Sequence, residues 1–316
     1  MTEIAHRFVE STSGLRMHVA EAGSGPLVLL LHGFPECWYS WRHQLVALAE
    51  AGYHAVAPDQ RGYARTGGPA DPAQYTMHHL VGDVVGLIDA LGEEQAVVAG
   101  HDWGAPVAWA AAQFRPERVR GVIGMSVPHR PRSSRPPVQA MREAFGDGFY
   151  MVYFQQPGVP EAEFDQDRSA MFRRMAATEP GEPSGLPVVP DGGGFLDASR
   201  EPKELPDWLT EEDIATYVRE YETAGFTGPL NWYRNLDRNW ELTAAWHRAP
   251  VTPPALFIAG DRDPVVVGGA RRAVDRLADF VPNLRDTVWL AGCGHWTQQE
   301  RPGEVNEAVI GFLRGL

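Results

Sequence analysis

The most constraining feature of the sequence is a series of short, continuously apolar segments separated by segments of helical periodicity. The segment at 26–31 (PLVLLL) lacks the polar alternation of a strand with one solvated face. Continuous apolarity over so few residues is typical of a parallel strand covered on both faces. Similar segments lie at 53–58, 96–100, 119–127 and 254–260. They predict the strands of a mostly parallel central sheet.

Segments with helical spacing lie between these predicted strands. In 76–91, apolar residues recur at i, i+3 and i+4 behind a threonine cap, which predicts an amphipathic helix. Strands that alternate with helices indicate an α/β fold. Residues 7–11 and 15–22 alternate apolar and polar around a Ser-Gly pair and predict a hairpin. The end of the chain predicts a helix at 271–279, a strand at 285–290 and a helix that begins at Pro302.

The alternation stops after Val127 and resumes near Pro253. The intervening residues are richer in Arg, Pro, Glu and aromatic residues and contain no strand-like apolar run. We predict that they form a helical lid inserted into the core, with a mobile loop at 180–194, where proline and glycine cluster. The predicted domains are a first part of the core at 1–128, the lid at 129–250 and a second part of the core at 251–316.

Composition excludes several classes of protein. The formal net charge of the 316 residues is −13, and no run of Lys and Arg exceeds two, which argues against a nucleic-acid partner. Only Cys37 and Cys293 are present, so a disulfide framework is excluded and a reducing, cytoplasmic setting is expected. The histidines lack metal-ligand spacing, and we expect no metal or cofactor. No apolar run is long enough for a signal core or a membrane anchor.

The strongest local motif is Gly100-His101-Asp102-Trp103-Gly104, between a predicted strand and a predicted helix. This arrangement is typical of a nucleophile elbow, a tight turn that needs small residues two positions before and after the nucleophile. The central residue is Asp102, which is ionised at neutral pH and can attack an sp³ carbon to form an ester of the enzyme. The alternative is an ordinary turn in which the aspartate caps the helix.

Two further patterns favour the catalytic interpretation. The segment His32-Gly33-Phe34-Pro35 directly follows the first apolar strand, where the backbone N–H groups of Phe34 and Trp103 could form an oxyanion hole. Asp263 and His295 follow the last two predicted strands, which gives the chain order nucleophile, acid, histidine. Asp261 competes with Asp263 for the role of the acid. Cys37 lies near the first loop, but we expect it to be a small buried hydrophobe.

Several motifs extend beyond these residues, and on them the chain resembles the soluble epoxide hydrolases of the α/β-hydrolase superfamily over nearly its whole length. The motifs are HGFPE at 32–36 with Trp41-Arg42, DQRGY at 59–63, GHDWGA at 100–105, YMVYFQQPG at 150–158, GPLNWYRN at 228–235 and GHWTQ at 294–298.

The resemblance implies an α/β-hydrolase fold with a helical lid and the conversion of a small-molecule epoxide to a vicinal diol, in detoxification or biosynthesis. Asp102 would form an alkyl ester, which water activated by His295 and Asp263 would then hydrolyse. The family's two ring-opening phenols correspond to Tyr150 and Tyr233, with Tyr153 as an alternative to the first. A neutral phenol suits the protonation of an alkoxide leaving group. A monomer and a homodimer are both open.

Haloalkane and haloacetate dehalogenases remain an alternative. The first three motifs of this chain, at 32–36 with Trp41-Arg42, 59–63 and 100–105, also look like those of the dehalogenases. A dehalogenase would cradle a halide with Trp103 and a lid tryptophan, for which Trp208, Trp232, Trp240 and Trp246 are available. Phe34, however, stands where a halide-binding Asn is common. A non-catalytic binding protein of this fold is a further alternative, but it would be expected to have lost one of the catalytic groups.

Overall fold

The computed structural model describes residues 2–176, 186–199 and 201–316, which form two compact units. Unit 1 contains the residues up to 61, 77–131 and 248–316. Unit 2 contains 62–76 and 132–247, so a segment that the sequence analysis assigned to the core groups with the lid residues. Of the loop predicted at 180–194, residues 180–185 lie outside the described part of the chain.

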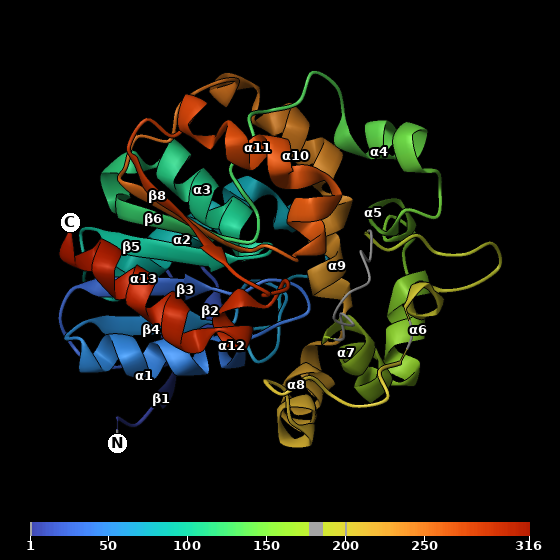
Figure 1. Ribbon diagram of the computed structural model, residues 1–316, viewed down its shortest axis with the longest axis horizontal. Coiled ribbons are helices and arrows are strands. Elements are labelled where there is room, and N and C mark those ends of the chain that lie inside the picture. The colour runs from blue at the N-terminus through green and yellow to red at the C-terminus, as the bar shows by residue number, and fades with distance from the viewer. Residues whose placement is uncertain (1, 177–185, 200) are drawn as a thin grey trace. The chain divides into compact units, whose positions relative to one another are not determined.

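Unit 1 is built on an eight-stranded sheet with the order β1-β2-β4-β3-β5-β6-β7-β8 (Figure 1). The strands are β1 (Ala5–Glu10), β2 (Arg16–Ala22), β3 (Leu27–Leu31), β4 (His54–Pro58), β5 (Ala96–His101), β6 (Val119–Met125), β7 (Ala255–Gly260) and β8 (Leu284–Leu290). Strands β3 to β8 are parallel, whereas β1 and β2 form the predicted antiparallel hairpin at one edge. The predicted α/β-hydrolase fold class is therefore confirmed.

The order of the strands determines where functional loops can meet. After β3, the chain runs through a helix to β4 on one side of β3, and it later returns to β5 on the other side. In open α/β sheets, ligands bind at the carboxyl ends of the strands where the strand order reverses in this way. The loops that follow β3 and β5 lie at such a point.

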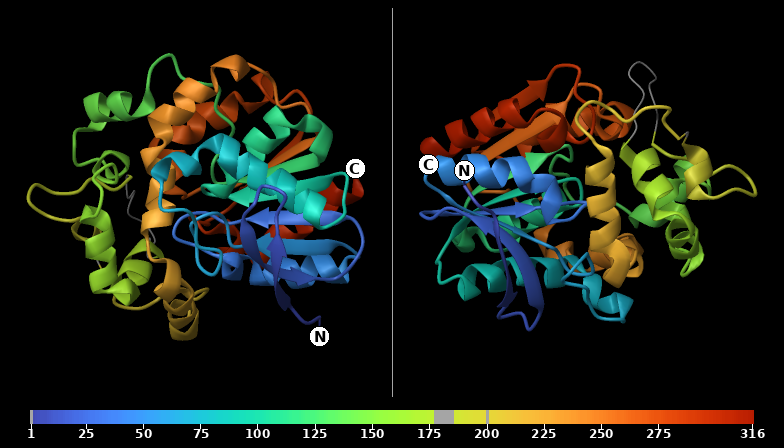
Figure 2. Two further views of the ribbon diagram at one scale, coloured as in Figure 1. Left: turned by 180° about the vertical axis from the view of Figure 1, so that it is seen from behind. Right: turned by 90° about the horizontal axis from the view of Figure 1, so that it is seen from below.

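Helices cover both faces of the sheet. The helix α1 (Arg42–Glu50) packs on β4 and against α12 (Thr297–Glu300) and α13 (Pro302–Arg314). On the other face, α3 (Gly104–Phe114) packs on β5 and β6 and against α2 (Met77–Ala90), as the right-hand view of Figure 2 shows. The all-buried patterns of β3, β5 and β7 follow from this double cover. The remaining elements are η1 (Trp38–Trp41), η3 (Pro116–Arg118), η6 (Val266–Ala270), α11 (Arg271–Asp275) and η7 (Leu277–Asp279).

Unit 2 consists of short helices. They are η2 (Pro72–Tyr75), α4 (Pro137–Phe145), α5 (Tyr150–Tyr153), α6 (Val159–Gln166), α7 (Arg168–Ala176), η4 (Phe195–Ala198), α8 (Glu211–Ala224), α9 (Thr227–Arg234), α10 (Leu236–Leu242) and η5 (Ala244–Trp246). Helix α8 begins with a capping box in which Thr210 and Asp213 bond each other's backbone N–H. Many of these helices are too short to be stable alone, so tertiary packing must stabilise them.

Packing of unit 2 relies on large aromatic rings and on ion pairs, of which the Arg234–Glu161 pair is largely buried. Phe154, Phe164, Tyr221, Phe226 and Trp232 are all almost fully buried. Arg234 pairs with Glu161 through two contacts of 2.7 and 3.0 Å, and Arg65 pairs with the buried Glu220. Removing one member of the largely buried Arg234–Glu161 pair would leave the other charge unpaired, which is strongly destabilising.

The segment 62–76 joins unit 2 through a close approach of two backbones. A Cβ atom at Gly228 in α9 would collide with the backbone of Gly62, and a Cβ at Gly62 would collide with Gly228. Next to this contact, the Tyr63 ring meets the Trp232 ring edge to face at 5.3 Å. The two motifs that contain these residues therefore belong to one packing unit, although they lie far apart in the sequence.

Candidate active site

Asp102 lies at the sharp turn between β5 and α3, as predicted for a nucleophile elbow. Its backbone has φ of +48°, a left-handed conformation that non-glycine residues rarely adopt. A Cβ at Gly100 would collide with the backbone of Gly104, and a Cβ at Gly104 would collide with Leu31. The turn is therefore possible only because both flanking positions are glycine. Such backbone strain is found preferentially at functional sites.

The loop after β3 lies directly against this turn. The Phe34 N–H donates to Asp102 Oδ1 at 2.8 Å. A side chain at Gly33 would overlap Asp102, so the close approach requires glycine there. Trp103 follows Asp102 directly and precedes the first residue of α3. The Phe34 amide thus points at the carboxylate, where an oxyanion would form after attack on an ester of Asp102.

His295 lies between two carboxylates. Its Nε2 is 3.5 Å from Asp102 Oδ2, and its Nδ1 is 3.1 and 3.2 Å from the two oxygens of Asp263. Asp263 is fully buried and also accepts from the Val265 N–H. Asp261, the competing acid, is exposed and accepts from the Gly292 N–H instead. The geometry therefore places Asp263 in the orienting position and Asp261 in a turn.

Nearby charges and hydrogen bonds shift the pKa values of His295 and Asp102. Burial alone would lower the pKa of His295, but the charges of Asp263 and Asp102 and hydrogen bonds to both raise it well above its usual value. Burial would raise the pKa of Asp102, but hydrogen bonds from His295 and Phe34 and the nearby histidine charges lower it overall. Asp102 is therefore a carboxylate at neutral pH, as a nucleophile of this type must be.

In unit 2, Tyr150 and Tyr233 lie next to each other. Their rings meet edge to face with centroids 6.1 Å apart, although 83 positions separate them in the chain (233 − 150). Both rings also contact the buried ring of Phe154, at 5.7 and 5.0 Å. Gln155 helps to hold the two segments together, because its side-chain amide donates to the carbonyls of Met151 and Tyr233.

Tyr153, the alternative to Tyr150, has a different partner. Its hydroxyl donates to Glu163 Oε2 at 3.0 Å, and burial together with this carboxylate raises the pKa of Tyr153 to about 12. Glu163 also accepts from the N–H groups of Phe195 and Leu196. The Tyr153 hydroxyl is thus part of the contact that anchors residues 195–196 to α6, whereas the rings of Tyr150 and Tyr233 face each other.

The structure adds residues to the site that sequence reasoning did not assign. Glu36 and His101 are both buried and are 2.8 Å apart, directly behind Asp102 and His295. Gln298 and Gln299 in α12 donate to the same Glu36 carboxylate. Glu36, His101 and Gln298 stand inside the motifs 32–36, 100–105 and 294–298, so their positions could have been found, but no spacing rule indicated that they meet.

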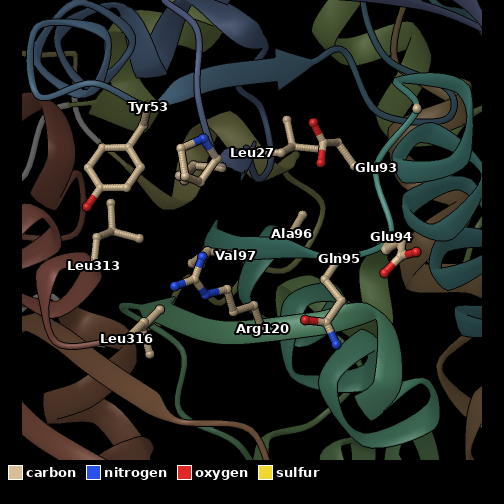
Figure 3. Close-up of a pocket in the computed structure, with 13 residues that line it drawn as sticks. Leu27, Tyr53, Glu93, Glu94, Gln95, Ala96, Val97, Arg120, Leu313 and Leu316 are labelled. Carbon is tan, nitrogen blue, oxygen red and sulfur yellow. The ribbon is translucent and has the colours of Figure 1, made fainter.

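A pocket of about 540 Å³ lies elsewhere in unit 1, at the amino ends of β3 and β5. Figure 3 shows Tyr53, Leu313 and Leu316 on one side of this pocket and Glu93 and Glu94 on the other. Asp102 lies at the carboxyl end of β5, the other end of the same strand. Because catalytic groups of α/β sheets lie at the carboxyl ends of strands, we do not assign this pocket to the active site.

The described residues contain neither a cluster of metal-ligating side chains nor a helix that could span a membrane. Across 2–176, 186–199 and 201–316, His, Cys, Asp and Glu do not gather in a group of three or more that could hold a metal ion. Within the same ranges, none of the helices has the length and apolarity needed to cross a membrane. Cys37, expected to be a buried hydrophobe, is fully buried.

Comparison with known proteins agrees with this geometry. The family model described as the alpha/beta hydrolase fold matches residues 26–302. The chain is 47% identical to epoxide hydrolase A of Mycobacterium tuberculosis over 96% of each chain, and 44% identical to epoxide hydrolase 3 of Siraitia grosvenorii over 99% of each chain. The crystal structure of epoxide hydrolase A from Mycobacterium thermoresistibile is similar with a TM-score of 0.94, at 48% identity and 99% coverage of both chains. An epoxide hydrolase from an endophytic Streptomyces has a TM-score of 0.95 at 45% identity, covering 99% of this chain and 96% of that one. The chain therefore belongs to the epoxide hydrolase family of the α/β-hydrolase superfamily.

Proposed function

We propose that this enzyme converts epoxides and water to vicinal diols through a covalent ester of Asp102. The observation that carries the proposal is the elbow itself. A carboxylate, in place of a serine, occupies the strained turn and lies 3.5 Å from a histidine that a second carboxylate orients. A carboxylate nucleophile suits attack on an sp³ carbon, whereas its attack on an ester would give an anhydride.

In the first step, Asp102 attacks one ring carbon of the epoxide. A carbon–oxygen bond to Asp102 forms while a carbon–oxygen bond of the ring breaks, which leaves an alkoxide on the neighbouring carbon. Tyr150 and Tyr233 hydrogen-bond this oxygen, and one of them protonates it. The adjacency of the two rings supports a shared role, because two phenols side by side can donate to one oxygen.

Esterification also changes the charge on His295. In the free enzyme both ring nitrogens face carboxylates, and the raised pKa keeps the ring an imidazolium at neutral pH. The ester of Asp102 is neutral, so one of the two charges that hold the proton disappears. The pKa of His295 therefore falls, and the ring becomes able to act as a base. Hydrolysis of the ester should speed up as the pH rises through this lowered pKa.

In the second step, His295 takes a proton from water, and the hydroxide attacks the carbonyl carbon of the ester. The N–H groups of Phe34 and Trp103 stabilise the oxyanion. Collapse breaks the bond between the carbonyl carbon and the alkyl oxygen and restores the Asp102 carboxylate. The water gives one proton to His295, which restores the imidazolium, and the other to the departing diol oxygen. The proton that His295 released after esterification replaces the one given by tyrosine, so the reaction balances.

The dehalogenase alternative would need lid tryptophans with free indole N–H groups. Trp240 donates its Nε1–H to the Ser133 carbonyl at 2.8 Å and lies under the Arg132 guanidinium. Trp232 is fully buried against Tyr63. Two of the four candidate tryptophans therefore have structural roles in unit 2, which weakens the dehalogenase hypothesis.

The test is product analysis of the wild type and Asp102→Asn on alkyl, aryl and trans-disubstituted epoxides and on haloalkanes. We expect diol from the wild type, and a loss of at least about 10⁴-fold in Asp102→Asn before any deamidation. In a single turnover in heavy-oxygen water, label should enter Asp102. Free halide without diol, or label that enters the diol directly, would overturn the proposal.

A further inference from the structure

The backbone of Tyr150 is bonded to a segment that follows much later in the chain, residues 187–198. The Tyr150 N–H donates to the Pro187 carbonyl at 3.1 Å, and the Val189 N–H donates to the Gly148 carbonyl at 2.7 Å. An antiparallel bridge lies between these two bonds. A Cβ at Gly148 would collide with the Val189 carbonyl, so this approach requires glycine. One end of the 187–198 segment therefore holds the backbone of the first proposed phenol.

Glu163 in α6 holds the other end of this segment. Its Oε2 accepts from the Phe195 N–H at 2.9 Å, and its Oε1 accepts from the Leu196 N–H at 2.6 Å. These N–H groups belong to the start of η4, where no carbonyl of the helix can bond them, so a carboxylate is a strong partner for them. A Cβ at Gly194 would come within 2.4 Å of Glu163 Oε1. The carboxylate can therefore keep this place only beside a glycine.

Phe195 connects the contact at Glu163 with the ring of Tyr150. Phe195 is 3% exposed, and its ring lies against the rings of Phe154 and Phe164, at centroid distances of 5.0 and 5.6 Å. The Tyr150 ring lies 6.5 Å from the Phe195 ring and 5.7 Å from that of Phe154. The segment therefore supports Tyr150 twice, through its backbone at one end and through its ring at the other.

Tyr233 depends on different contacts. Tyr150 lies on α5, which has only four residues, and so short a helix is not stable by its own hydrogen bonds. Tyr233 lies on α9, a helix of eight residues, and the next residue, Arg234, pairs with Glu161 at 2.7 and 3.0 Å. Removing the support from Glu163 should therefore displace Tyr150 more than Tyr233.

We infer that Glu163 is a positioning residue that holds the 187–198 segment against α5 and thereby places the Tyr150 hydroxyl for opening of the epoxide ring. The inference rests on the proposed function, from which it takes the donor role of Tyr150. In that mechanism Tyr150 acts only in ester formation, whereas hydrolysis of the ester uses Asp102 and His295 in unit 1. Loss of Glu163 should therefore slow the first step and leave the second step unchanged.

The main test is Glu163→Gln, followed in single turnovers by quenched-flow mass spectrometry. Glutamine has nearly the same shape as glutamate, but its amide nitrogen cannot accept a hydrogen bond, so one of the two backbone N–H groups loses its partner. We expect ester formation to slow about tenfold, because small displacements of a catalytic group have large effects on rate. Hydrolysis of the ester should stay within about twofold of wild type.

Gly194→Ala is a second variant, which keeps the Glu163 carboxylate. Gly194 has φ of −108°, which alanine adopts without strain. The added methyl group, however, would displace the carboxylate from its place beside the Phe195 N–H. We expect the same selective loss of ester formation, and this variant keeps the inference testable if Glu163→Gln folds poorly. Wild-type ester formation in both variants would overturn the inference.

A double-mutant cycle shows whether Glu163 acts through the Tyr150 hydroxyl. In Tyr150→Phe that hydroxyl is absent, so adding Glu163→Gln should slow ester formation by less than about twofold. In Tyr233→Phe the Tyr150 hydroxyl remains, and adding Glu163→Gln should still slow ester formation about tenfold. A purely structural role would give the same loss in both backgrounds, which would overturn the inference.

The matched control is Glu220→Gln, the same substitution at a buried carboxylate of unit 2 that pairs with Arg65. This variant loses an ion pair, so its melting temperature should fall, but ester formation should keep its wild-type rate. A loss of rate as large as that of Glu163→Gln would show that any loss of stability in unit 2 slows ester formation, and it would overturn the inference.

Failure of the proposed function would give a different result. If the wild type forms no ester, or if Tyr150→Phe forms it at the wild-type rate, the proposed role of Tyr150 fails. Hydrogen exchange of the Tyr150 amide, measured by NMR, then still decides whether Glu163 holds the segment. Exchange should be faster in Glu163→Gln, because the bond to the Pro187 carbonyl opens more often. Unchanged exchange would overturn the inference.

Discussion

The two units hold their proposed catalytic groups by different means. In unit 1, Asp102 follows β5, Asp263 follows β7 and His295 follows β8, so the hydrogen-bonded sheet sets their positions. In unit 2, Tyr150 and Tyr233 lie on short helices that are held by aromatic packing and by the Arg234–Glu161 ion pair. A backbone ladder defines position more strictly than side-chain packing. Asp102 and His295 are each proposed to be required for one step, whereas two tyrosines are proposed to donate to one oxygen. Substitutions of the former should therefore stop the reaction at a defined step, and those of the latter should give graded losses.

The largest expected effect comes from removing the base. In His295→Gln, Asp102 keeps its place in the elbow, so the ester should form but be hydrolysed about 10⁴-fold more slowly. Intact-protein mass spectrometry should show a stable increase equal to the mass of the epoxide. Diol formation at a normal rate with no trapped adduct would contradict the ester mechanism. It would also show that a substitution in unit 1 does not block a defined step.

The tyrosines of unit 2 should give intermediate effects. Tyr150→Phe and Tyr233→Phe should each slow ester formation by about 10- to 10³-fold, because a phenol donor to the developing alkoxide is lost. The double variant should be slower than either single variant. Stopped-flow quenching of tryptophan fluorescence or quenched-flow mass spectrometry would measure the step. Wild-type rates of ester formation in both single variants would remove the tyrosines from the mechanism.

A histidine outside the site tests how unit 1 responds to acid. His129 is buried near the rings of Trp109 and Phe280, its Nε2 lacks a hydrogen-bond partner among the described residues, and burial lowers its pKa to about 4. The unfolded chain binds this proton near the ordinary pKa, about 6.5. The contribution of neutral His129 to stability is therefore fully present above pH 6.5, and about 3 kcal/mol of it is lost as the pH falls to 4.

In His129→Leu, this part of the acid sensitivity should disappear. Urea unfolding at pH 7, 5.5 and 4.5 would measure the free energy of unfolding of both proteins. The free energy of unfolding of the variant should increase relative to that of the wild type as the pH falls. Parallel loss of stability in both proteins would show that the titration of His129 does not contribute.

The smallest expected effect is that of Tyr153→Phe. Its hydroxyl bonds Glu163, away from the facing rings of Tyr150 and Tyr233. We expect a loss of about 1 kcal/mol in stability from the missing hydrogen bond, with ester formation within about twofold of wild type. A rate loss as large as that of Tyr150→Phe would assign the ring-opening role to Tyr153 instead.

Local patterns in the sequence were sufficient to predict those parts of the fold and site that depend on residues close together in the chain. Continuous apolar runs predicted the buried parallel strands, because a strand covered on both faces has no position for polar residues. Gly100 and Gly104 predicted the elbow, because any larger residue collides there. The order of Asp102, Asp263 and His295 followed from strand ends that meet at one edge of the sheet.

Contacts between distant segments could not be predicted in this way. Asp261 and Asp263 stand two positions apart, and only the course of the loop decides which of them faces His295. Tyr150 and Tyr153 are both on α5, and only the position of Glu163 gives the Tyr153 hydroxyl a carboxylate partner. Likewise, residues 62–76 join unit 2 because of a contact with α9.

The sequence by itself therefore determined the α/β class, the elbow with a carboxylate at its centre and the chain order of Asp102, Asp263 and His295, because each depends on local sterics and periodicity. Only the tertiary structure shows which acid faces His295, which tyrosine faces Tyr233 and which buried charges lie near them. The Glu36–His101 pair shows the reason: its members are 65 residues apart, and His101 bonds a carbonyl 194 residues further along. Such partners are chosen by how the sheet is assembled, and no local pattern encodes that choice.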